Sequence, residues 1–242
     1  MIYKDEREKE GLHNMKKSCL HYPYPVVEKD GTLSYGGSQA WFESRIMQKS
    51  GCGAVAGTDV LLYLSLHKES CATDFFREAE FSNGILDLPE YKNYVNHIRK
   101  SYLHIIPHFG MAGWMVTMGL NRYFRRNRIG LRAVWGVLPR NLWNRISAML
   151  AHDIPVILLI GPNFPFVWGK HKLTFYQRSS QGEYSPSCQT KAHFVTVTGM
   201  DETWLRISSW GKEYYVNRIE YQRYVQKHSS FLVSNICYIK SR

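Results

Sequence analysis

The sequence lacks the cysteine patterns that mark disulfide frameworks and structural zinc sites. Its five cysteines are odd in number, widely scattered and include no CxxC pair. Such usage argues against both kinds of site and favours a reducing compartment, where a reactive thiol survives. We therefore expect neither a metal nor a cofactor.

Long hydrophobic segments are also missing. The longest purely aliphatic run covers residues 156–160, which is far too short to cross a bilayer. Residues 1–15 are dense in charge and have no apolar stretch of signal-peptide length. The sequence therefore predicts a cytoplasmic protein with no membrane segment.

Acidic residues are fewer than basic residues. The chain has 31 Lys and Arg against 20 Asp and Glu, which gives a net charge of +11. Part of this excess lies in one basic run: Arg122, Arg125, Arg126, Arg128 and Arg132. Such a run suits a nucleic acid or an acidic substrate. No nucleic-acid motif accompanies it, so we interpret it as a solvated helix face.

The order of the patterns along the chain predicts an α+β fold. Residues 1–30 look irregular, residues 75–150 look mostly helical, and residues 153–242 look like a sheet. The expected helices of the middle part cover 91–102, 114–124 and 142–150. The expected strands cover 156–160, 173–177, 193–198, 204–209, 214–217 and 231–239. Helices come before a mostly antiparallel sheet, and 1–242 is predicted to form a single domain.

Cys52 is the first candidate for chemistry. It lies among small residues, in Ser50-Gly51-Cys52-Gly53-Ala54, at the start of a helix expected over 51–67. Apolar side chains lie nearly all round that helix, which is typical of a buried helix. The positive end of the helix dipole favours an anion, so we expect Cys52 to be biased towards the nucleophilic thiolate.

His193 is the second candidate. It begins a strand-like run, and a hairpin through 199–203 would bring it across from Ser208 or Ser209. A residue there can hydrogen-bond the imidazole and fix its tautomer, which a general base requires. Trp210 follows and is expected to shield that hydrogen bond from water.

These motifs resemble those of the papain-like cysteine peptidase superfamily. The likeness lies in the cysteine at a helix start, the later strand histidine, and Ser208-Ser209-Trp210-Gly211. Gly51-Cys52-Gly53 and His193-Phe194-Val195 look closest to the bacterial branch that removes double-glycine leader peptides. The likeness covers about 35–66 and 153–217. It implies a central N-terminal helix packed on a C-terminal antiparallel sheet, with 75–150 as a helical insertion.

The resemblance also implies a role for each residue. Cys52 would be the nucleophile that forms an acyl-enzyme, and His193 the base that takes its proton. The backbone N–H of Cys52 would form half of an oxyanion hole. An upstream glutamine would complete it; we favour Gln39, in a glycine-rich loop, over the alternative Gln48.

The sequence departs from the family pattern at the third residue. Ser208 stands where the family has Asn or Asp, and a hydroxyl stabilises an imidazolium less than a carboxylate does. The main hypothesis is a cysteine peptidase with a peptide or protein substrate. A transglutaminase-like acyltransferase or an amidase is an alternative, and so is a papain-like binding protein that has lost catalysis.

Overall fold

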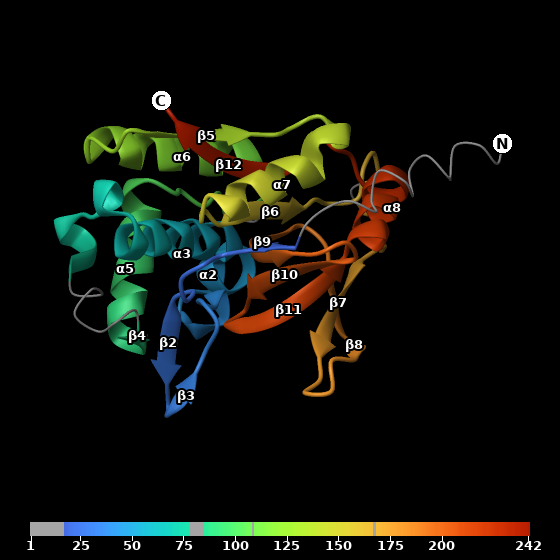
Figure 1. The fold of residues 1–242 in the computed structure, drawn as a ribbon, viewed down its shortest axis with the longest axis horizontal. Coiled ribbons are helices and arrows are strands. Elements are labelled where there is room, and N and C mark those ends of the chain that lie inside the picture. The colour runs from blue at the N-terminus through green and yellow to red at the C-terminus, as the bar shows by residue number, and fades with distance from the viewer. Residues whose placement is uncertain (1–16, 78–84, 108, 167) are drawn as a thin grey trace.

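The computed structural model describes residues 17–77, 85–107, 109–166 and 168–242. A long central helix, α3 (Cys52–His67), packs against a large antiparallel sheet (Figure 1). The α+β class expected from the sequence is therefore confirmed. The assignment to the papain-like fold itself stays a prediction.

The large sheet contains nine strands among the described residues. Its order is β5-β12-β6-β9-β10-β11-β7-β8, with the short β1 paired to β9, and every pairing is antiparallel. The strands are β1 (Ser18–Cys19), β5 (Leu131–Trp135), β6 (Val156–Ile160), β7 (Leu173–Arg178), β8 (Tyr184–Thr190), β9 (His193–Met200), β10 (Trp204–Ser209), β11 (Lys212–Asn217) and β12 (Ile236–Ser241). Every residue of β9 is buried, which places this strand at the centre of the core.

Glycine lets α3 approach the sheet closely. A Cβ atom at Gly53 would lie 3.1 Å from the Phe194 ring of β9, tighter than ordinary packing allows. Nearly all of α3 is buried, as its all-round apolar pattern predicted. The other α-helices are α2 (Arg45–Ser50), α5 (Leu88–Ser101), α6 (Gly113–Arg126), α7 (Leu142–Ala151) and α8 (Arg218–His228). The short 3₁₀ helices are η1 (Gln39–Trp41), η2 (Glu69–Cys71), η3 (Asp74–Phe76) and η4 (Pro139–Asn141).

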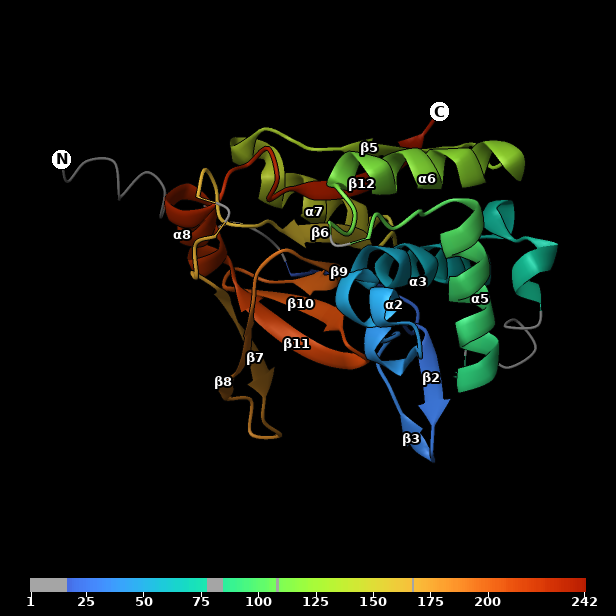
Figure 2. The same ribbon diagram turned by 180° about the vertical axis from the view of Figure 1, so that it is seen from behind.

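A second, three-stranded sheet stands beside α5 (Figure 2). It consists of β2 (Val26–Lys29), β3 (Thr32–Leu33) and β4 (Ile85–Asp87), with β2 parallel to β4. Residues 1–30 were expected to be irregular, which is wrong for β1 and β2; residues 1–16 lie outside the described part. The β2–β3 turn has positive φ angles at Asp30 (52°) and Gly31 (74°), as a tight hairpin requires.

The expected helices at 91–102, 114–124 and 142–150 are confirmed, with ends shifted by a few residues. The region 75–150 is nevertheless not purely helical, because β5 pairs with β12 at the edge of the large sheet. The helix α8 and the strand β8 were missed, and β12 begins at Ile236 rather than at residue 231. Within the described residues, no helix combines the length and apolar character needed to span a lipid bilayer.

Candidate active site

Cys52 is the first residue of α3, as expected, and is partly buried. The backbone N–H groups of Phe194, Gly53 and Cys52 itself lie within reach of its thiol and lower its pKa. Burial acts more strongly in the opposite direction, so the pKa of Cys52 is raised above its ordinary value. The expected bias towards thiolate is therefore wrong for this arrangement, because desolvation outweighs the nearby amides.

His193 is the first residue of β9 and is buried. Its Nε2 lies 2.7 Å from the hydroxyl oxygen of Ser209. Desolvation lowers the pKa of His193 to about 3, so its imidazole is neutral at physiological pH. Because Nε2 is engaged by Ser209, Nδ1 is the ring nitrogen left to serve a reaction.

The hydrogen-bond partner of His193 is Ser209 and not Ser208, which corrects the expectation from the Trp-Gly alignment. A β-bulge between Arg206 and Ile207 shifts the pairing of β10 with β9, so that Ser208 lies opposite Thr196. Side chains alternate between the two faces of a strand. The shift therefore turns Ser208 away from His193 and places Ser209 on its face.

Ser208 instead serves the neighbouring loop. Its hydroxyl donates a hydrogen bond of 2.8 Å to the backbone oxygen of Tyr35. This contact ties β10 to the segment that carries Gln39. In the described arrangement Ser208 is thus a structural contact of that loop rather than an orienting partner of the imidazole.

Trp210 occupies the first position of a two-residue turn between β10 and β11. The register pairs Ser209 with Lys212, and both turn residues have positive φ angles, 50° at Trp210 and 74° at Gly211. This conformation suits a type I′ hairpin but is uncommon for a bulky residue. It lays the indole flat on the imidazole of His193, with ring centroids 4.3 Å apart and planes inclined by 18°.

Of the two glutamines considered, Gln39 faces the site. It lies in η1, is buried, and lines the same cavity as Cys52 and His193. Its Nε2 donates a hydrogen bond of 2.6 Å to the backbone oxygen of Gln48, while its buried Oε1 has no hydrogen-bond partner in the structure. The Gln48 side chain points elsewhere and donates to the backbone oxygen of Phe42 at 2.8 Å.

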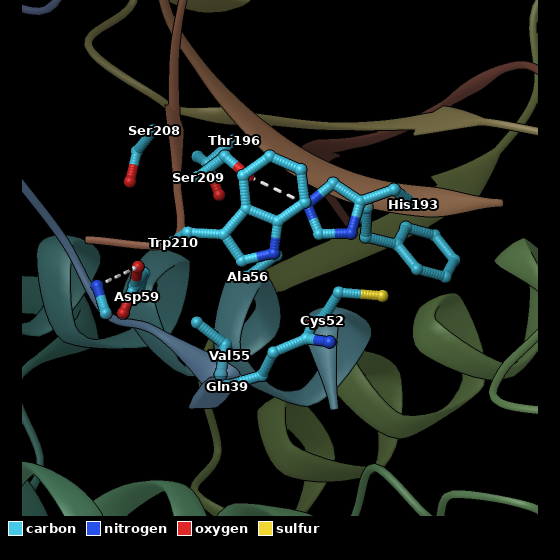
Figure 3. A pocket seen from close by; sticks show the side chains of 12 residues that line it. Gln39, Cys52, Val55, Ala56, Asp59, His193, Thr196, Ser208, Ser209 and Trp210 are labelled. Atoms are coloured by element: carbon cyan, nitrogen blue, oxygen red, sulfur yellow. Dashed lines mark hydrogen bonds between the residues drawn. The ribbon is translucent and has the colours of Figure 1, made fainter. Parts of the chain in front are cut away.

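One small cavity joins these side chains (Figure 3). Cys52 reaches it from α3, His193 from β9 and Gln39 from η1, and in this view the sulfur lies below the imidazole. The cavity has a volume of about 10 Å³, which is room for roughly one water molecule and not for a peptide. A thiol, an imidazole and an amide from three separate elements therefore line one small cavity.

Asp59 lies two turns after Cys52 on the same face of α3, where the sequence suggested no catalytic role, and it lines the same cavity. It is buried, and its carboxylate accepts hydrogen bonds from the hydroxyl of Tyr91 at 2.6 Å and from the backbone N–H of Gly37 at 3.0 Å. Burial raises the pKa of Asp59 to about 6 despite these donors. Asp59 thus anchors the loop that leads to Gln39.

The sequence left two features of this site undecided: which serine contacts His193, and what Asp59 binds. Ser209 was considered as a partner but not preferred, because a bulge leaves no clear trace in the residues that form it. Asp59 shares a helix face with Cys52, yet its partner Gly37 is known only once the loop is placed.

Among the described residues, no three His, Cys, Asp or Glu side chains are grouped so as to hold a metal ion. No protein-family model, curated protein or solved structure matches this chain.

Proposed function

We propose that this chain is a papain-like cysteine hydrolase that acts on peptide or amide bonds. The observation that carries the proposal is the single cavity lined by Cys52, His193 and Gln39, three residues brought together from a helix, a strand and a loop. Nucleophile, base and oxyanion donor are the groups that acyl transfer to a thiol requires.

The contacts of His193 support one assignment of roles to its two ring nitrogens. When Nε2–H donates to the hydroxyl of Ser209, Nδ1 is free to accept the thiol proton of Cys52. The sulfur then attacks the substrate carbonyl and forms a thioester, and the imidazolium returns the proton to the leaving amine. Water, deprotonated by the same imidazole, hydrolyses the thioester and regenerates the thiol.

The amide of Gln39 is suited to stabilise the oxyanion of the tetrahedral intermediate. One of its two N–H bonds is held by the backbone oxygen of Gln48, which fixes the side chain and leaves the other N–H free. The backbone N–H of Cys52, at the start of α3, is the second donor in this proposal. Donors of this kind are each worth roughly 10²–10³ in rate.

The resting arrangement makes this chemistry unfavourable until the surroundings of His193 change. The ordinary pKa of a thiol is 9.0 and that of Cys52 lies higher, while the pKa of His193 is about 3. The thiol is thus a weaker acid than usual and the imidazole a much weaker base, so proton transfer between them is strongly unfavourable in the resting arrangement. We infer that a substrate must displace the cover of His193 and hydrate the ring, which raises its basicity before reaction.

The small cavity and the raised pKa of Cys52 also favour a second candidate, a papain-like binding protein without catalysis. A water-sized cavity and a protonated thiol are what a non-catalytic descendant of such a fold would retain. The two functions differ in the reactivity of Cys52 towards an electrophile that occupies a substrate site.

A peptidyl fluoromethyl ketone, followed by peptide mass spectrometry, separates the two. Cys188 is also partly buried and serves as the internal reference. For a hydrolase we expect Cys52 to be labelled at least about 100-fold faster than Cys188, and His193→Ala to remove that advantage, since a general base contributes roughly 10²–10⁴ in rate. Equal labelling of the two cysteines would contradict the hydrolase and favour the binding protein.

A second assay distinguishes hydrolysis from acyl transfer. A thioester substrate is offered in buffer and then with an added primary amine. A hydrolase releases the free acid in both cases, whereas an acyltransferase forms the amide when the amine is present. The product masses decide between them, and Cys52→Ala should return both products to their uncatalysed rates.

A further inference from the structure

The basic run of the sequence meets the end of the large sheet at a hollow on the protein surface. The helix α6 lies along β5 and β12 at one edge of the molecule (Figures 1 and 2). The hollow between them has a volume of about 660 Å³ and is lined by Met118, Asn121, Arg125, Arg132, Lys240, Ser241 and Arg242. Four of these residues are cationic, and none of the described residues that line the hollow is acidic.

A second hollow continues the first along α6. It has a volume of about 470 Å³ and shares Met118 and Arg125 with its neighbour. Its lining includes Trp114, which is 56 % exposed, and Arg122. Positions 114, 118, 122 and 125 follow one face of a helix, so the two hollows form one track. That track is aromatic at one end and cationic at the other.

The cations of this track are held close together without acidic partners. Arg132 and Lys240 lie directly opposite each other in the β5–β12 ladder, where like charges destabilise a sheet. The ion pairs found among the described residues involve other side chains: Lys29–Asp30, Arg77–Asp74 and Lys92–Glu43. A multiply charged anion in the hollow would offset this repulsion by binding both cations.

The geometry disfavours a peptide that adds to the sheet edge. The outer edge of β5 is occupied at Ala133, because the Asn121 side chain donates to its backbone oxygen at 2.8 Å and accepts from its N–H at 2.9 Å. That edge is thus closed to strand addition at this point. A ligand of this track must instead be recognised through the arginine side chains and the exposed indole.

We propose that the track binds single-stranded nucleic acid, with phosphates at Arg125, Arg132 and Lys240 and a base stacked on Trp114. Guanidinium groups bind phosphate oxygens in pairs. Aromatic side chains beside a positively charged groove are the usual platform for unpaired bases. This site shares no lining residue with the cavity of Cys52. The proposal therefore does not depend on the proposed hydrolase activity.

The test is fluorescence anisotropy of the full chain with a labelled 20-nucleotide oligothymidylate over a range of salt concentrations. We expect binding that weakens as salt rises. The slope of log K against log[salt] is negative, and the combined change Arg125→Ala, Arg132→Ala and Lys240→Ala should make it less steep by about 2, at roughly 0.7 per phosphate contact. Arg223→Ala is the single-charge control, since Arg223 is exposed on α8 at the far end of the molecule (Figure 1).

Variants of Trp114 test base stacking separately, because they do not change the charge of the track. Trp114→Ala should weaken binding at least about fivefold through lost stacking, and Trp114→Phe should restore most of it. If neither Trp114→Ala nor the triple change weakens binding more than Arg223→Ala does, the proposal is overturned. Competition by polyglutamate or by anionic vesicles as strong as that by oligothymidylate would also overturn it, and would indicate an acidic protein or a membrane surface instead.

Discussion

The indole of Trp210 covers the imidazole of His193 in a nearly parallel stack, with 4.3 Å between the ring centroids. The residue that holds this cover has a left-handed backbone conformation, φ 50°, which bulky side chains rarely adopt. Strain of this kind is retained where neighbouring structure determines it, and it often lies at functional sites. Burial lowers the pKa of His193 to about 3, and Trp210 is one of the groups packed on the ring.

Removing the cover should therefore change the acidity of the ring. In Trp210→Gly, glycine accepts the positive φ without strain and leaves His193 open to water. We expect the pKa of His193 to rise from about 3 towards its ordinary value of 6.5. Titration of the ring protons by nuclear magnetic resonance measures this. Trp168→Gly, at a residue 77 % exposed, is the control; an unchanged His193 pKa in Trp210→Gly would show that other groups desolvate the ring.

The two adjacent serines give a matched pair of variants. Ser209→Ala removes the hydroxyl that lies 2.7 Å from His193 Nε2, whereas Ser208→Ala removes a hydroxyl that donates to the Tyr35 backbone oxygen. We expect Ser209→Ala to slow labelling of Cys52 by the fluoromethyl ketone by roughly two- to tenfold, the worth of one hydrogen bond. Ser208→Ala should label at the wild-type rate. The reverse order would restore Ser208 as the orienting residue.

The serine pair also illustrates how far the sequence could be interpreted. Helices and strands with strong periodicity were predictable, because α3 is apolar all round and 156–160 is a continuous aliphatic run. The hairpin that faces His193 was predictable in outline. Which serine shares the face of His193 depends on a one-residue bulge near Arg206, and register of that kind is set by the assembled sheet.

The chemistry of the site was less predictable than its location. A cysteine at a helix start suggests a stabilised thiolate, since the amides that favour the anion are local. The desolvation that opposes them comes from distant parts of the chain that close over Cys52, and it decides the direction of the pKa shift. The strand β5 was missed because its pairing partner β12 is also distant in sequence, about a hundred residues further along the chain.

The buried imidazole should make the protein sensitive to acid. Between about pH 3 and pH 6.5 the unfolded chain binds a proton at His193 and the folded chain does not, so stability falls as pH falls through this window. His193→Gln abolishes that titration. The unfolding free energy of the wild type relative to the variant should therefore drop by roughly 3 kcal/mol from pH 7.5 to 4.5. Urea denaturation at the two pH values measures it, and a constant difference would contradict the shift.

Asp59 should have the opposite effect. Its pKa is about 6 in the folded chain against an ordinary 3.8, so the folded chain holds a proton that the unfolded chain has lost, and stability falls as pH rises through this range. Asp59→Asn removes the titration and keeps an acceptor for Tyr91. The wild type should lose roughly 3 kcal/mol relative to this variant between pH 3.5 and 7. A difference that grew with pH would mean that Asp59 is ionised and paired.

The protonation state of Cys52 can be tested without a substrate. Its thiol has a raised pKa and faces a neutral imidazole, so thiolate forms only in alkali. We expect the rate of alkylation by iodoacetamide, followed at the Cys52 peptide, to rise about tenfold per pH unit up to at least pH 9, with no plateau on the acid side. His193→Gln should leave this profile unchanged, because a neutral ring does not hold the anion. A plateau below pH 7 that disappears in His193→Gln would reveal a preformed thiolate–imidazolium pair, and with it a site that is already open before any substrate arrives.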